Sequence, residues 1–109
     1  MNWSLGLGAG LVMLVAALSP ALAKQARCYT TDDGYYDCSF EPLGGGSFEI
    51  AAGGYPSFQI VIDTPGVAFG YGRYEEGGNF VALPGTFRRN ADDGACWDND
   101  ETGVQICAW

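Results

Sequence analysis

The chain has 109 residues, a net charge of −8 and no histidine. Its 13 acidic side chains outnumber 5 basic ones, which argues against nucleic acid and anionic membrane surfaces as partners, because both attract basic patches. Without histidine there is no Ser-His or Cys-His pair for acyl transfer. We therefore expect no catalytic residue, no cofactor and no enzymatic activity.

The first 23 residues are typical of a cleavable export signal. Residues 5–23 are almost wholly apolar, Pro20 interrupts them, and Ala21 and Ala23 supply the small residues that a signal peptidase requires. Cleavage after Ala23 would leave one secreted or periplasmic domain, residues 24–109, with no stable membrane insertion. An uncleaved anchor is the alternative, since about 19 apolar residues approach the length of a membrane span.

Four cysteines follow, and an even number in an exported chain predicts disulfides. Residues 28–38 form a predicted hairpin whose loop, Asp32-Asp33-Gly34, places Cys28 opposite Cys38. Cys96 and Cys107 close a C-terminal hairpin in the same way. The alternative is the nested pairing, Cys28–Cys107 with Cys38–Cys96, which would tie the two ends of the domain together.

Short runs of alternating apolar and polar residues, separated by glycine-rich turns, occupy the middle of the chain. In residues 67–72 large side chains alternate with Ala68, Gly70 and Gly72, and this bare face should allow close approach of a ring or backbone, or tight curvature. Further strands are predicted at 48–50, 58–63, 80–83, 86–89 and 104–109. Turn signals every eight to twelve residues predict an all-β fold, a small antiparallel β-barrel or β-sandwich stapled by two disulfides.

Residues 70–78 read Gly-Tyr-Gly-Arg-Tyr-Glu-Glu-Gly-Gly. They resemble the Ser-Gly-x-x-Tyr loop of the secreted and membrane-anchored inhibitors of c-type lysozyme, which are small periplasmic β-barrels with a disulfide. By this resemblance Tyr74 matches the loop tyrosine, whereas Gly70 stands where that family carries the serine that enters the target's active site. The family's functional lysine has no counterpart.

The resemblance predicts partner contacts through Arg73, Tyr74, Glu75 and Glu76. The alternative for the same segment is an ordinary hairpin with Gly77-Gly78-Asn79 at its tip.

The C-terminal hairpin has the most specific pattern. A four-residue loop pairs Trp97 with Ile106 and Cys96 with Cys107. This register directs Trp97 and Ile106 to the core and leaves the disulfide and Trp109 on the outer, more polar side.

Asp98, Asp100 and Thr102, followed by Gly103, match the first half of a calcium-binding loop. The twelfth position should be glutamate but is Trp109, and Asp-rich turns also form without a metal. We therefore expect no metal site, with calcium as the alternative.

Small size, acidity and abundant aromatic residues favour a non-enzymatic binding protein, with a protein partner that is cationic. One candidate partner is a cationic cell-wall hydrolase, which the chain would inhibit. The alternatives are a structural protein of the cell envelope or extracellular matrix, and a small carbohydrate-binding module. Composition permits the carboxylate pairs of glycosidases, but a β domain this small with short loops has little room for a substrate cleft.

Overall fold

Nine strands follow one another along residues 23–109, the part of the chain that the computed structural model describes. The expected export signal lies outside these residues except for Ala23. Within the described part no helix has the length and apolarity needed to cross a membrane. The strands are β1 (Lys24–Thr30), β2 (Gly34–Gly44), β3 (Ser47–Ala51), β4 (Ser57–Thr64), β5 (Val67–Arg73), β6 (Val81–Ala82), β7 (Phe87–Arg89), β8 (Cys96–Asn99) and β9 (Gln105–Ala108).

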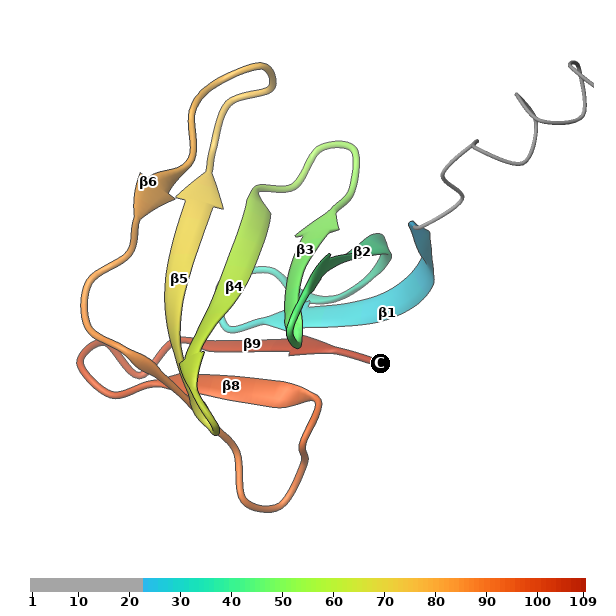
Figure 1. Cartoon of the computed structure of the whole chain (residues 1–109). Helices are drawn as coiled ribbons and strands as arrows, with labels where there is room; N and C mark the ends of the chain where they lie inside the picture. Colours follow the sequence, from blue (N-terminus) through green and yellow to red (C-terminus); the bar gives the residue numbers. More distant parts are fainter. Residues whose placement is uncertain (1–22) are drawn as a thin grey trace, which may run out of the picture.

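The strands form one antiparallel sheet in the order β4-β3-β2-β1-β9-β8-β7-β5-β6 (Figure 1). Because β4 also pairs with β5, eight strands close into a barrel, and β6 remains a short addition to β5. Of the two predicted architectures, the barrel is the one observed. Its closure leaves only β6 as an edge strand among the described elements.

Side chains from one face of each strand fill the barrel, as the alternating pattern predicted. In β3, for example, Phe48 and Ile50 are buried and Glu49 between them is only half-buried. The buried core comprises Cys28, Tyr36, Cys38, Phe48, Ile50, Phe58, Ile60, Ala68, Phe87, Trp97 and Ile106.

The bare face of β5 points into the barrel, and aromatic rings occupy the space that its missing side chains leave. A β-carbon at Gly70 would lie 2.3 Å from Cε1 of Phe87, and one at Gly72 would lie 2.9 Å from the hydroxyl of Tyr74. The predicted close approach is confirmed. The large side chains of the strand consequently face outward, and Phe69 is 42% exposed.

Both local disulfides are formed, Cys28–Cys38 and Cys96–Cys107, and the described residues contain no free cysteine. The nested alternative is therefore wrong. Two disulfides indicate an oxidising, extracytoplasmic environment.

The predicted register of the first hairpin is wrong by two residues, because Cys28 lies opposite Tyr36 and not opposite Cys38. The turn starts earlier than expected: the Asp33 amide donates to Oγ1 of Thr30, and the Thr30 hydroxyl donates to the Asp33 carboxylate, both at 3.2 Å. A shift of two residues keeps both cysteines on the same face of the sheet, so the disulfide still forms.

The predicted register of the C-terminal hairpin is confirmed, with Trp97 opposite Ile106 and Cys96 opposite Cys107. Trp97 is 2% exposed and Ile106 is fully buried. The disulfide lies on the opposite face from these core residues, as expected, yet Cys107 is only 1% exposed. The disulfide is more buried than the sequence indicated, because Tyr29 of the neighbouring strand β1 lies directly opposite Cys107.

The antiparallel order brings four connections to one end of the barrel, which we call the loop end. They are the β1–β2 turn (31–33), the β3–β4 loop (52–56), the β5–β6 loop (74–80) and the β8–β9 loop (100–103).

The opposite end of the barrel carries the connection after β7 and the exposed side chain of Arg89. The guanidinium of Arg89 lies 4.5 Å from the centroid of the Trp97 ring and donates a 2.8 Å hydrogen bond to the carbonyl of Gly94. In Figure 1 the β3–β4 and β5–β6 loops are neighbours at the top, and the connection after β7 lies at the bottom.

Candidate functional site

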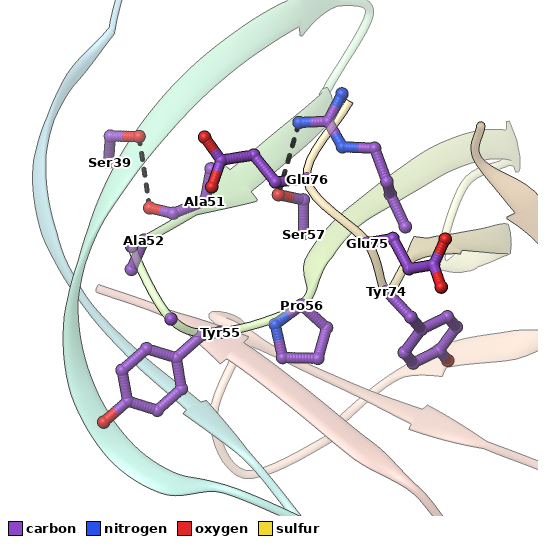
Figure 2. A pocket seen from close by; sticks show the side chains of 12 residues that line it. Ser39, Ala51, Ala52, Tyr55, Pro56, Ser57, Tyr74, Glu75 and Glu76 are labelled. Atoms are coloured by element: carbon purple, nitrogen blue, oxygen red, sulfur yellow. Dashed lines mark hydrogen bonds between the residues drawn. The ribbon is translucent and has the colours of Figure 1, made fainter. Parts of the chain in front are cut away.

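A groove of about 560 Å³ lies between the β3–β4 and β5–β6 loops. We call it the loop groove; Figure 2 shows its lining side chains. It is bounded by Ser39, residues 51–57 and residues 73–76. All four residues predicted to contact a partner, Arg73 to Glu76, line it.

One wall of the loop groove is the β3–β4 loop, whose shape is fixed by its aromatic residue. The Tyr55 ring stacks on the buried Tyr36 ring with 4.2 Å between centroids and 5° between planes. The Tyr55 amide also donates to the carbonyl of Ala52 at 3.2 Å. Tyr55 remains 40% exposed, so its ring is anchored to the core and still offers surface to a partner.

The other wall is the start of the β5–β6 loop, which turns tightly at its glycines. The Gly78 amide donates to the carbonyl of Glu75 at 2.8 Å, and Gly77 has a φ of 76°, which favours glycine. The predicted hairpin is confirmed, with its tight turn beginning at Glu75. The same segment is thus both a hairpin and a wall of the groove.

Arg73 is held away from the glutamates that follow it. Its guanidinium reaches Oγ of Ser57 at 3.5 Å, drawn as a dashed line in Figure 2, and lies 4.8 Å from the centroid of the Phe80 ring. Glu75 and Glu76 are exposed and take part in neither of the two ion pairs found in residues 23–109. Their carboxylates therefore remain available to a basic group.

Tyr74 lies at the boundary between the loop groove and a second, smaller cavity. Its ring covers Gly72 and meets the Phe58 ring edge-on, with 6.0 Å between centroids. The second cavity, of about 170 Å³, opens inside the mouth of the barrel and is lined by Tyr74 together with core side chains. We call it the inner pocket.

The loop end carries a concentration of negative charge. Six of the 13 acidic residues of the chain lie in its connections: Asp32, Asp33, Glu75, Glu76, Asp100 and Glu101. Burial and the negative charge of Asp32 raise the pKa of Tyr74 above its usual value. Burial, Asp33 and Tyr55 raise the pKa of Tyr36 to about 12, and the Tyr36 hydroxyl has no hydrogen-bond partner.

The loop resemblance to the lysozyme inhibitors does not extend to the geometry of position 70. Gly70 lies in the middle of β5, and a side chain there would point at Phe87 inside the barrel. A serine at this position could not be presented to a partner. Tyr74, the matched tyrosine, is 59% exposed and does face the loop end.

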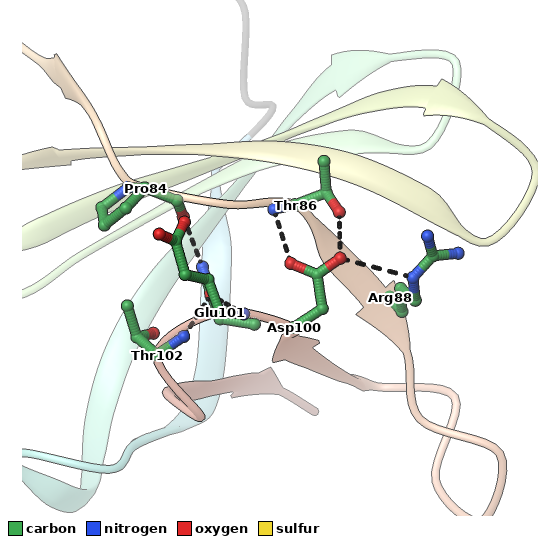
Figure 3. Close-up of polar contacts among 7 residues, drawn as sticks. Pro84, Thr86, Arg88, Asp100, Glu101 and Thr102 are labelled. Atoms are coloured by element: carbon green, nitrogen blue, oxygen red, sulfur yellow. Dashed lines mark hydrogen bonds and ion pairs between the residues drawn. The ribbon is translucent and has the colours of Figure 1, made fainter.

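The three oxygen-bearing residues that match the first half of a calcium-binding loop, Asp98, Asp100 and Thr102, have separate partners. Figure 3 shows that Asp100 accepts hydrogen bonds from the amide and hydroxyl of Thr86, at 3.0 and 2.6 Å, which hold its pKa below the usual range. Asp98 accepts from two side-chain amides, and the Thr102 hydroxyl accepts from a backbone amide. Residues 23–109 contain no group of three acidic, cysteine or histidine side chains that could hold a metal.

Asn99, between Asp98 and Asp100, organises this region. It is 5% exposed. Its side-chain carbonyl oxygen accepts hydrogen bonds from the backbone amides of Glu101 and Thr102, and its side-chain amide donates to the backbone carbonyl of Pro84 at 2.7 Å. Asn99 was not singled out from the sequence, yet it links the β8–β9 loop to the connection between β6 and β7.

The sequence located half of the loop groove and missed the rest. The β3–β4 loop was recognised only as a turn, and Tyr55 and Ser57 were not singled out. A large aromatic residue beside Gly53-Gly54 was the available signal, because a turn has no need of one. No family model, curated protein or solved structure matches the chain.

Proposed function

We propose that this chain is an extracytoplasmic binding protein, without catalytic activity, that holds a basic protein partner in the loop groove. The observation that carries the proposal is the juxtaposition of two uncommitted carboxylates, Glu75 and Glu76, with the exposed rings of Tyr55 and Tyr74. The location of the protein in the periplasm or outside the cell is part of this proposal, and its support is the apolar N-terminal segment.

Carboxylates beside aromatic faces are the surroundings that a lysine or arginine side chain favours. The carboxylate supplies charge-assisted hydrogen bonds, and a ring face attracts the cation by about 0.5–2 kcal/mol. The remaining acidic residues of the loop end extend this attraction outward. A basic partner would be drawn in at a rate that falls as salt is added.

A cationic cell-wall hydrolase is one partner of this chemistry. The resemblance of residues 70–78 to lysozyme inhibitors supports it. A side chain at position 70 would point into the barrel, however, so this chain would contact such a partner in another way than those inhibitors do. In our proposal the groove receives a protrusion of the partner, and no loop of this chain enters an active site.

The alternative of a structural envelope or matrix protein depended on self-association through open sheet edges. The closed barrel offers only the two residues of β6 as an edge in the described part of the chain. Sedimentation velocity over a concentration series should therefore give a monomer. Concentration-dependent assembly would favour the structural role instead.

The proposal is tested with a basic c-type lysozyme and with the basic proteins of the exported fraction as probes. The double variant Glu75→Gln/Glu76→Gln removes two charges from the groove. Its control, Asp63→Asn/Asp92→Asn, removes two exposed charges outside the loop end.

Calorimetry at about 0.1 M salt should show at least about a tenfold loss of affinity for the groove variant, equivalent to 1.4 kcal/mol. The control should change little, because charges separated by more than the Debye length of about 10 Å at 0.1 M salt are screened. Equal losses in the two variants, or no binding of any basic protein, would overturn the proposal.

A further inference from the structure

The inner pocket provides a second binding feature beside the loop groove. Its apolar walls are the side chains of Phe58, Leu83, Phe87 and Val104, and its volume is about 170 Å³. A cavity of about 150 Å³ with apolar walls is enough to bind benzene. The inner pocket thus has room for a single aromatic ring or one branched aliphatic side chain.

The rim of the inner pocket is polar and belongs to the loop end. Thr30 and Asp32 border it on one side, and Asn99 and Thr102 on the other. The side-chain carbonyl oxygen of Asn99 accepts two hydrogen bonds and its NH2 group donates one, and the Thr30 hydroxyl is hydrogen-bonded to Asp33. What the pocket itself offers an incoming group is therefore chiefly apolar surface.

Within residues 23–109, Tyr74 is the only one that lines both the loop groove and the inner pocket. Its position is set by the absence of a side chain at Gly72, since a β-carbon there would lie 3.0 Å from the ring. A ligand that fills both cavities must therefore contact Tyr74. The loop groove carries the two glutamates, and the inner pocket is lined mainly by apolar side chains.

We infer that the inner pocket receives an apolar side chain of the same partner whose basic side chain lies in the loop groove. This inference rests on the proposed function. It specifies the recognition element as one basic and one aromatic or branched aliphatic side chain, one for each of the two cavities that Tyr74 borders. Buried anchors of this kind, seated in pockets near charged contacts, provide most of the affinity of many protein interfaces.

A short extended segment of the partner can present both side chains to two cavities that share Tyr74. In an extended segment, residues i and i+2 point to the same side and are about 7 Å apart. The element is therefore a basic residue followed, two positions later, by an apolar residue.

The pocket is tested first with toluene, which carries no charge. Titration should shift the methyl resonances of Leu83 and Val104, and the Val104→Phe variant should lose this response because the new ring fills the space. Thr102→Phe is a second variant that fills the pocket from an exposed position, so its fold is not at risk. Absence of a toluene response in the folded wild-type protein would overturn the inference.

The combination of one basic and one apolar side chain is tested with three blocked tripeptides: Arg-Ala-Phe, Arg-Ala-Ala and Ala-Ala-Phe. Arg-Ala-Phe should bind at least about tenfold more tightly than Arg-Ala-Ala, and Thr102→Phe should abolish this advantage. Glu76→Gln should weaken both arginine peptides to the same extent and leave Ala-Ala-Phe unchanged.

The outcomes separate this inference from the proposed function. If Glu76→Gln weakens the arginine peptides but the phenylalanine adds nothing, the inference is overturned and the basic partner stands. If phenylalanine adds affinity and Glu76→Gln has no effect, the loop groove loses its proposed role and the paired recognition element falls with it.

Discussion

The ring of Phe87 lies where a side chain on Gly70 would have to be. A β-carbon built on Gly70 would be 2.3 Å from Cε1 of Phe87, and Phe87 itself is fully buried. The ring of Phe87 thus fills the space that a side chain on Gly70 would otherwise occupy. The small residue is a packing requirement of the barrel interior.

Gly70→Ala should destabilise the domain by about 1–3 kcal/mol, because the ring of Phe87 has to move within a closed core. Gly53→Ala is the matched control, since a β-carbon at Gly53 has no neighbour within 4 Å and its φ lies outside the left-handed region. Urea denaturation of both variants makes the comparison. Equal stability of the two would show that the core yields at no cost.

Trp97→Ala should cost about 3–5 kcal/mol, the range for emptying a buried aromatic site. Trp97 is 2% exposed in the core, whereas Trp109 is 47% exposed and contributes a 3.0 Å hydrogen bond from its indole to Asp93. Trp109→Ala should therefore cost about 1 kcal/mol, the usual contribution of one hydrogen bond. Denaturation with both disulfides intact checks the order; a larger effect at Trp109 would contradict the packing described for β8 and β9.

Local patterns in the sequence were sufficient for most of the strands and for the disulfide pairs. The four-residue loop that ends at Gly103 predicted the register of Trp97 and Ile106 correctly. Gly34 in the first hairpin has the expected left-handed conformation, with a φ of 72°. The first register was nevertheless wrong, because the buried Thr30 side chain joins the turn through Asp33. Nothing local in the sequence distinguishes that turn from the predicted one.

The loop groove was only half predictable for a different reason. Residues 73–76 carry charged and aromatic side chains that stand out in a glycine-rich segment. Their opposite wall, residues 51–57, comes from another part of the chain and meets them only when β4 and β5 pair. The inner pocket depends on four separate connections, so no single segment of the sequence could indicate it.

The domain should lose stability as the pH rises from about 10 toward 12. Burial raises the pKa of Tyr36 from 10.0 to about 12, so the folded state retains the phenolic proton after the unfolded chain has released it. This contribution is complete below pH 10 and is lost as the pH passes through the higher pKa. Tyr36→Phe should flatten the decline.

The same variant should cost little at neutral pH, because the Tyr36 hydroxyl is buried without a hydrogen-bond partner and its removal leaves nothing unpaired. Denaturation midpoints measured across the alkaline range give both results. A steep alkaline decline that persists in Tyr36→Phe would assign it to other groups, such as Tyr74, whose pKa is also raised.

The most direct test of the central claim is amide hydrogen exchange on the protein with and without a basic partner. Binding in the loop groove should slow exchange in residues 51–57 and 73–76, which belong to exposed turns and strand ends in the free protein. The connection at 90–95, at the opposite end of the barrel, should exchange at the same rate in both states. Protection at 90–95 with no change at the loop groove would contradict the account.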